Sequence, residues 1–177
     1  MEGEVGLMAE SILNGMRILA VDDEPDVLAV LEDEILEAAP KCQFEKAISY
    51  QEASKKIESQ NFDMVILDIM GVRGFDLLDQ AVKRNFQVAM LTAHSLNPES
   101  LKRSIEMKAR AYLPKEKMSE IVPFLEDIVK ESDHLFGWGH LMNKLEGYFE
   151  SRWGEYWQKA EENFWKDFEK KTSRIKR

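Results

Sequence analysis

Cysteine is almost absent from this 177-residue sequence, which has only Cys42. A single cysteine excludes an internal disulfide and any zinc site built from cysteines, and it fits a reducing cytoplasm. Long apolar runs are absent too, since none approaches the ~20 residues that a membrane-spanning helix needs. Glu2, Glu4 and Glu10 occupy the N-terminus, where a signal peptide has a basic start and a long apolar middle. We therefore expect a soluble, cytoplasmic protein without a membrane span.

Basic charge is in deficit as well. The chain has 24 Lys and Arg against 33 Asp and Glu, a net charge of −9, which argues against a general nucleic-acid binder. The deficit is uneven, because residues 134–177 carry nine basic and seven acidic residues and all four tryptophans. This change near Asp133 predicts three parts: a flexible N-terminal arm over 1–15 with a possible short helix at 7–13, a domain over 16–133, and an extension over 134–177.

Apolar runs and helical spacing alternate along residues 16–133. The run Met64-Val65-Ile66-Leu67 leads directly into Asp68, and an apolar run of this kind is typical of a buried strand in a parallel sheet. Similar strand ends fall near residues 22, 48, 92 and 114, with helical patterns starting near Pro25, Gln51, Phe75, Pro98 and Ile121. Such alternation predicts an α/β fold, with a five-stranded parallel sheet, right-handed crossovers and helices on both faces.

Polar side chains stand at four of these strand ends. They are Asp22, Asp23, Asp68, Thr92 and Lys115. Taken singly, an aspartate after a strand is usually a turn or cap residue, and a lysine is usually solvated. Because the carboxyl ends of parallel strands meet at one edge of a sheet, we expect all five side chains to share one crevice.

The residue types in this crevice fit phosphoryl transfer. Three carboxylates would repel one another, and Mg²⁺ relieves this because it binds carboxylates together with waters and a phosphate oxygen. Asp68 could then attack phosphorus as a nucleophile. Lys115 and the cation would neutralise the phosphoryl oxygens, while the Thr92 hydroxyl donates to one of them.

Over roughly residues 16–132 the chain resembles the receiver domain of two-component response regulators. The motifs that carry the resemblance are Val21-Asp22-Asp23-Glu24-Pro25, Val65-Ile66-Leu67-Asp68-Ile69-Met70, Leu91-Thr92-Ala93 and Ala111-Tyr112-Leu113-Pro114-Lys115. The resemblance implies a doubly wound, flavodoxin-like receiver fold. It also implies that Asp68 is the phosphoacceptor, that Asp23 and Asp68 bind Mg²⁺ directly, that Asp22 binds it through water, and that the Met70 carbonyl is the third protein ligand.

The same resemblance implies a switch and partners. Thr92 and Tyr112 would form the switch pair, in which the hydroxyl moves inward on phosphorylation and the aromatic ring follows. The phosphoryl donor would be a phosphohistidine on a sensor histidine kinase or phosphotransfer protein, and the output surface, which binds a downstream protein target, would lie at about 97–132.

Two positions depart from the family pattern. The family places Met-Pro after the acceptor and a glycine eight residues on, whereas Gly74 follows Asp68 by six residues and no proline is present. Lys115 follows Pro114 instead of preceding a proline, so we expect no cis bond there. We interpret His94 as a solvent-facing loop residue and Cys42 as structural.

The extension over 134–177 has an aromatic-rich apolar face. Its members recur at threes and fours: Leu141, Leu145, Tyr148, Phe149, Trp153, Tyr156, Trp157, Ala160, Phe164 and Phe168. This spacing predicts one amphipathic helix of about 30 residues, although Gly147 and Gly154 favour bends. One helix cannot bury this face alone, so it packs on the domain, on a second copy in a homodimer, or on another protein. The basic end leaves membrane-surface or nucleic-acid contact open, but the extension is too short for a DNA-binding helix-turn-helix domain.

Three functions remain open from the sequence. The first is a phosphoacceptor signalling domain with no enzymatic output. The second is a small aspartyl-phosphate phosphohydrolase, which is disfavoured because Met70 stands two residues after Asp68, where such enzymes usually carry a second aspartate. The third is a pseudo-receiver scaffold, which the complete set of five polar side chains disfavours.

Overall fold

The computed structural model describes residues 10–94 and 96–175. The elements are β1 (Arg17–Val21), α2 (Pro25–Ala38), β2 (Gln43–Ala47), α3 (Tyr50–Ser59), β3 (Met64–Asp68), α4 (Gly74–Lys83), β4 (Gln87–Thr92), α5 (Pro98–Glu106), β5 (Ala111–Pro114), α6 (Ile121–Lys130), α7 (His134–Trp153) and α8 (Glu162–Ile175). Two 3-10 helices, Lys115–Glu120 and Trp157–Glu161, follow β5 and α7. The sequence pattern did not predict either of them.

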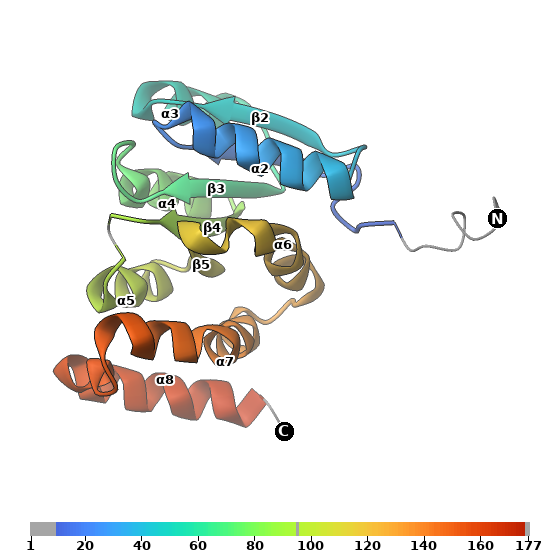
Figure 1. Ribbon diagram of the computed structural model, residues 1–177. Coiled ribbons are helices and arrows are strands. Elements are labelled where there is room, and N and C mark those ends of the chain that lie inside the picture. Colours follow the sequence, from blue (N-terminus) through green and yellow to red (C-terminus); the bar gives the residue numbers. More distant parts are fainter. Residues whose placement is uncertain (1–9, 95, 176–177) are drawn as a thin grey trace.

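The five strands form one sheet in the order β2-β1-β3-β4-β5, and every neighbouring pair is parallel. Helices α2 and α6 pack together on one face, while α3, α4 and α5 cover the other (Figure 1). With helices on both faces, all five residues of β3 are buried. The predicted α/β fold with a five-stranded parallel sheet is confirmed.

Local sequence signals set several helix starts. The side chains of Ser49 and Asn97 accept hydrogen bonds from the backbone N–H groups of Glu52 and Ser100, and so cap α3 and α5. Pro25 occupies the first turn of α2, where its missing N–H needs no partner. These caps fix where each helix leaves the sheet edge, and therefore where the side chains just before each helix lie.

The prediction of a loose arm over residues 1–15 is wrong for the part that the structure describes. Residues 12–15 form a turn, Leu13 is fully buried, and the Asn14 side chain accepts a hydrogen bond from the backbone N–H of Lys41. The short helix predicted at 7–13 does not extend through this turn, and its start lies outside the described residues. Burial of Leu13 holds this segment against the domain because its apolar side chain leaves water.

The prediction of one helix of about 30 residues in the extension is also wrong. Helix α7 ends at Gly154, whose φ of 90° is not helical, and the chain reverses so that α8 packs back on α7 (Figure 1). We call α7 and α8 with their connection the C-terminal hairpin. Its buried apolar side chains are Trp138, Leu141, Met142, Leu145, Phe149, Trp157, Trp165 and Phe168. Helix α8 therefore provides apolar surface against which the apolar face of α7 is buried, which a single helix could not provide for itself.

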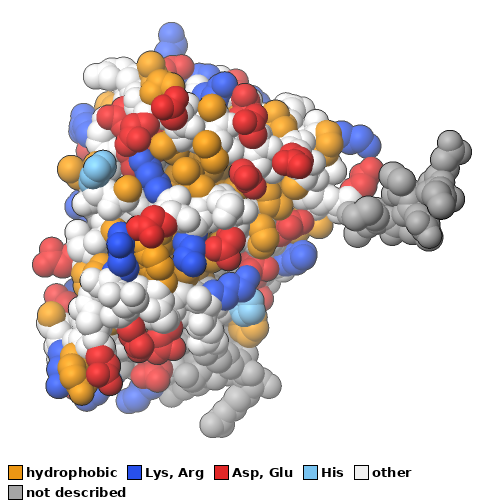
Figure 2. Space-filling view, viewed as in Figure 1, with side chains coloured by type: hydrophobic (Ala, Val, Ile, Leu, Met, Phe, Trp, Pro, Cys, Tyr) orange, Lys and Arg blue, Asp and Glu red, His pale blue; other side chains and the backbone are white. Residues whose placement is uncertain are grey.

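Charged side chains stand among the apolar residues of the helices. In the part of the chain that the structure describes, no helix is long and apolar enough to cross a membrane. Figure 2 shows acidic and basic side chains interspersed with hydrophobic ones over the visible face.

Candidate functional site

Two carboxylates come from the end of β1. Asp22 is 1% exposed, whereas Asp23, the next residue, faces solvent. The Oδ1 atom of Asp22 accepts a hydrogen bond of 2.9 Å from the backbone N–H of Glu24. This bond holds the Asp22 carboxylate at the N-terminus of α2. Asp22 is therefore enclosed by the domain, whereas the side chain of Asp23 lies on the solvent-exposed side of the crevice.

The third carboxylate, Asp68, ends β3 and is 5% exposed. The loop that follows Asp68 is short, and two glycines let its backbone pass close to Asp23 and to the backbone of Asp68. A Cβ on Gly71 would lie 2.5 Å from Oδ2 of Asp23, and a Cβ on Gly74 would lie 2.2 Å from the carbonyl oxygen of Asp68. The shortened loop noted in the sequence therefore packs directly against the acids, and only glycine fits at these two positions.

One oxygen from each of Asp22, Asp23 and Asp68 can be chosen so that all three lie within 4.8 Å of one another. Lys115 reaches the same point from the end of β5. Its Nζ lies 2.9 Å from Oδ2 of Asp22, 3.3 Å from Oδ1 of Asp68 and 3.5 Å from Oε1 of Glu24. The structure thus brings the predicted acids and lysine into one cluster.

The cluster perturbs the titration of its own members. Burial raises the pKa of Asp68 to about 7, and the charge of Asp22 adds to this effect while Lys115 partly offsets it. Burial also raises the pKa of Asp22. Burial alone would lower the pKa of Lys115, but its hydrogen bond with Asp22 and the charge of Asp68 raise it overall. One lysine does not compensate three close carboxylates, so the cluster favours an additional cation or proton.

A divalent cation fits this donor set. Three carboxylate oxygens at one sheet edge, one of them on an exposed residue, offer the hard ligands that Mg²⁺ prefers and leave room for water or a phosphate oxygen. The expected role of the Met70 carbonyl stays a prediction. The Met70 side chain is 54% exposed.

Thr92 ends β4 and is 1% exposed. Its hydroxyl oxygen is buried and has no hydrogen-bond partner in the part of the chain that the structure describes. An unsatisfied buried hydroxyl costs about 1–3 kcal/mol. A group bound at Asp68 that offers an oxygen acceptor to Thr92 would remove this cost.

Tyr112 lies on β5 and is fully buried. Its hydroxyl oxygen lies 2.7 Å from Oγ of Ser100 on α5, and its ring makes an edge contact with the ring of Phe149 on α7, with centroids 6.2 Å apart. Neither Ser100 nor Phe149 was predicted to belong to the site. Only the fold shows them, because no spacing rule links residues so far apart in sequence.

Two further expectations concern residues outside the cluster. His94 is exposed, which confirms that it faces solvent. Cys42 is buried, its thiol donates to the backbone carbonyl of Met16, and burial raises its pKa to about 11. A thiol with this pKa is a poor nucleophile at neutral pH, so the structural interpretation of Cys42 is supported. Glu24, which contacts Lys115, was missed, although it directly follows the two predicted acids.

Comparison with known proteins agrees with this geometry. The family model of the response regulator receiver domain matches residues 18–126. The chain belongs to this family. The two-component response regulator ARR18 of Arabidopsis thaliana is 36% identical over an alignment of 108 positions, which covers 57% of this chain and 16% of that protein. The chain therefore spans about a sixth of the length of this relative.

Solved receiver structures give the same picture of the fold. TrrA of Thermotoga maritima, solved in complex with Mg²⁺ and BeF, is 31% identical with a TM-score of 0.55, covering 64% of this chain and 98% of that one. A CheY-like receiver protein of Methanospirillum hungatei is 25% identical with a TM-score of 0.54, covering 66% and 98%. The receiver family match ends at residue 126, so α7 and α8 lie outside it.

Proposed function

We propose that Asp68 accepts a phosphoryl group from a phosphohistidine on a sensor histidine kinase or phosphotransfer protein. The observation that carries this proposal is the convergence on Asp68 of two further carboxylates and the Lys115 amine. Thr92, whose buried hydroxyl has no partner among the described residues, ends the strand next to the one that Asp68 ends. Membership of the receiver family supports it. The magnesium bound in the TrrA complex supports Mg²⁺ as the cation.

The transfer needs little beyond positioning. A carboxylate oxygen of Asp68 attacks phosphorus, the P–N bond breaks, and its electron pair returns to the ring. A phosphohistidine that is protonated on its other nitrogen leaves as neutral imidazole, and Asp68 becomes an acyl phosphate. Lys115, already 3.3 Å from Asp68, neutralises charge on the transferred group.

Asp22, Asp23 and Asp68 would hold Mg²⁺, with the Met70 carbonyl as a further ligand. When bound, the ion supplies positive charge that offsets the phosphoryl oxygens. The Thr92 hydroxyl donates to one of these oxygens and thereby gains the acceptor that it lacks among the described residues. Thr92 and Tyr112 then act as the switch pair, because the strands that carry them are neighbours in the sheet.

The output of this switch is contact with a downstream protein target, without enzymatic turnover and without a DNA-binding domain in residues 134–177. Met70 offers no acid for hydrolysis of small phosphate esters, so Asp68 carries out only its own phosphorylation and dephosphorylation. A cytoplasmic location fits the single buried thiol. Homodimerisation through 134–177 has less support than the sequence pattern suggested, since five of the ten residues of its apolar face are buried within one chain and three more are half-buried.

A small phosphoryl donor tests the proposal. The chain is incubated with acetyl phosphate and Mg²⁺, and its intact mass is measured. We expect the mass to increase by one phosphoryl group, and to return to its starting value after treatment with hydroxylamine, which cleaves acyl phosphates.

Two variants make this test specific. Asp68→Asn removes the nucleophile and should abolish the added mass, whereas Asp79→Asn, an exposed carboxylate on α4, should retain it. Equal labelling of the Asp68→Asn variant, or no labelling of the wild-type chain in Mg²⁺, would overturn the proposal.

A further inference from the structure

The C-terminal hairpin lies against the edge of the sheet at β5, between α5 and α6 (Figure 1). Trp138 is fully buried, and its indole N–H donates a 2.8 Å hydrogen bond to the carbonyl of Ala109, two residues before β5. Farther along α7, Phe149 is also fully buried, and Trp153 donates a 3.3 Å hydrogen bond to the carbonyl of Leu96. Helix α7 is therefore anchored along the length of this face.

One of these anchors contacts the switch residue Tyr112, and a second contacts the loop that follows Thr92. Phe149 contacts the ring of Tyr112, and Trp153 contacts Leu96, which lies four residues after Thr92 in the loop between β4 and α5. The rings of Phe149 and Trp153 are stacked on each other, 4.6 Å apart with an interplanar angle of 2°. The loop after Thr92 and the Tyr112 ring on the neighbouring strand therefore contact the same pair of stacked rings.

The stacked pair continues into the rest of the hairpin. Trp157 contacts both Phe149 and Trp153 edge-on, and Trp165 on α8 contacts Trp157. Since packed aromatic rings adopt discrete arrangements, a displacement of Phe149 alters the packing between α7 and α8. A small movement at Tyr112 is thus transmitted to the whole hairpin.

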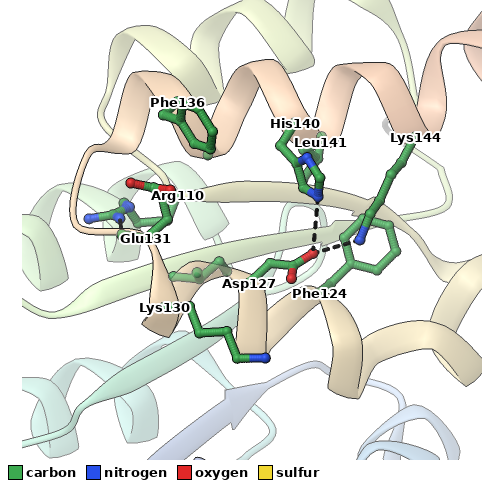
Figure 3. Close-up of a pocket in the computed structure, with 11 residues that line it drawn as sticks. Arg110, Phe124, Asp127, Lys130, Glu131, Phe136, His140, Leu141 and Lys144 are labelled. Atoms are coloured by element: carbon green, nitrogen blue, oxygen red, sulfur yellow. Dashed lines mark hydrogen bonds and ion pairs between the residues drawn. The ribbon is translucent and has the colours of Figure 1, made fainter. Parts of the chain in front are cut away.

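Elsewhere the hairpin is held less firmly. A cavity of about 200 Å³ lies between α6 and α7. Beside it, the carboxylate of Asp127 on α6 forms an ion pair with Lys144 on α7 (Figure 3). The ion pair between Arg152 and Glu116 is exposed, and exposed pairs contribute little to stability. The hold on the receiver therefore depends strongly on the aromatic anchors, of which Phe149 contacts Tyr112 and Trp153 contacts Leu96.

We infer that the C-terminal hairpin is an intramolecular ligand of the α5–β5–α6 face, and that phosphorylation of Asp68 weakens its hold by moving Tyr112 and the Leu96 loop away from Phe149 and Trp153. This inference rests on the proposed function. In the observed arrangement the Tyr112 ring is enclosed between Ser100 and Phe149. If the ring moves toward Thr92, Phe149 loses its contact. By linkage, the docked hairpin must then disfavour the phosphorylated state to the same degree.

A phosphate mimic tests the release directly. The full chain is titrated with Mg²⁺ and beryllofluoride, while fluorine NMR reports occupancy of the site and hydrogen exchange reports opening of α7. We expect amide exchange in α7 to accelerate at least tenfold when the fluorine signal shows a bound mimic. Bound mimic with unchanged exchange in α7 overturns the inference alone. Absence of a bound signal overturns the proposed function, and this inference with it.

Linkage gives a second, independent readout. Phe149→Leu keeps an apolar side chain but removes the ring contact with Tyr112, so beryllofluoride affinity should rise about fivefold, the lower end of typical allosteric coupling. Tyr156→Leu is the matched control, because Tyr156 belongs to the same segment but is 66% exposed, and its affinity should equal that of the wild type. An unchanged affinity in the Phe149→Leu variant, with α7 still folded by circular dichroism, contradicts the inference.

Discussion

At the scale of single residues, the ionisation of Asp68 is strongly disfavoured by its surroundings. Its pKa is raised to about 7 by burial and by the charge of Asp22. The folded state therefore binds the Asp68 proton more tightly than the unfolded chain does. The stabilisation from this proton is complete below the ordinary pKa of 3.8 and is lost as the pH rises toward 7.

Asp68→Asn removes this pH dependence. Without metal, the variant should be more stable than the wild type by about 1 to 3 kcal/mol at pH 8, and the gain should shrink toward pH 5. Urea unfolding in EDTA at the two pH values measures the difference, with Asp79→Asn as the control for loss of a surface carboxylate. A gain of the same size at both pH values would show that burial does not perturb Asp68.

Gly71 is the residue on which the shape of the acid cluster depends. Its φ of +85° and the closeness of Asp23 leave no room for a Cβ. Gly71→Ala should destabilise the fold by about 1–3 kcal/mol and weaken Mg²⁺ binding. Thermal unfolding and calorimetric titration measure the two effects.

The matched control for this change is Gly147→Ala. Gly147 lies within α7, and a Cβ there meets nothing within 4 Å. This substitution should stabilise the chain by about 0.5–1 kcal/mol and leave Mg²⁺ affinity unchanged. If both glycine variants behave alike, the close approach to Asp23 has no functional consequence.

At the scale of elements, the anchor of α7 can be tested apart from the switch. Trp138→Phe removes the indole N–H and leaves the Ala109 carbonyl without this donor, which should cost about 1–3 kcal/mol. Hydrogen exchange should accelerate first in α7 and α8, and global urea unfolding should shift by the same free energy. Tyr156→Phe, on an exposed side chain, should change neither, and equal losses in the two variants would rule out Trp138 as an anchor.

The elements of the receiver domain were largely predictable, whereas those of the extension were not. Strands such as β3 are read correctly because buried parallel strands are continuous apolar runs that end at a polar residue. The spacing in 134–177 correctly indicated an apolar face, but periodicity cannot tell one long helix from two packed helices. Gly154 was the informative signal, since its positive φ ends α7.

Candidate site residues divide in the same way. Asp22, Asp23, Asp68 and Lys115 were predictable because parallel topology brings strand ends together. Ser100, which contacts Tyr112, was not, because its position depends on how α5 packs on β5. Side-chain contacts between two packed elements, even consecutive ones such as α5 and β5, carry no short-range sequence signal.

At the scale of the whole molecule, the acid cluster should couple metal binding to global stability. Mg²⁺ that binds the folded state alone stabilises it by about 2.7 kcal/mol at one hundred times its Kd. Unfolding temperature should therefore rise with Mg²⁺ and fall again in EDTA. Asp23→Asn should lose this response, whereas Asp33→Asn, an exposed carboxylate on α2, should keep it. A Mg²⁺ response that survives in Asp23→Asn would place the ion elsewhere.

The whole chain thus consists of a receiver whose strand ends form an acidic, lysine-bridged cluster and a hairpin that lies on the face beside its switch residues. For this receiver to signal as proposed, the Asp68 carboxylate must form a mixed anhydride with phosphate. The most direct measurement is to phosphorylate the chain in Mg²⁺, reduce it with borohydride, and sequence the peptides by mass spectrometry. Reduction of an aspartyl phosphate yields homoserine, so we expect homoserine at position 68 alone. Homoserine at another aspartate, or an unchanged Asp68 in a phosphorylated chain, would contradict it.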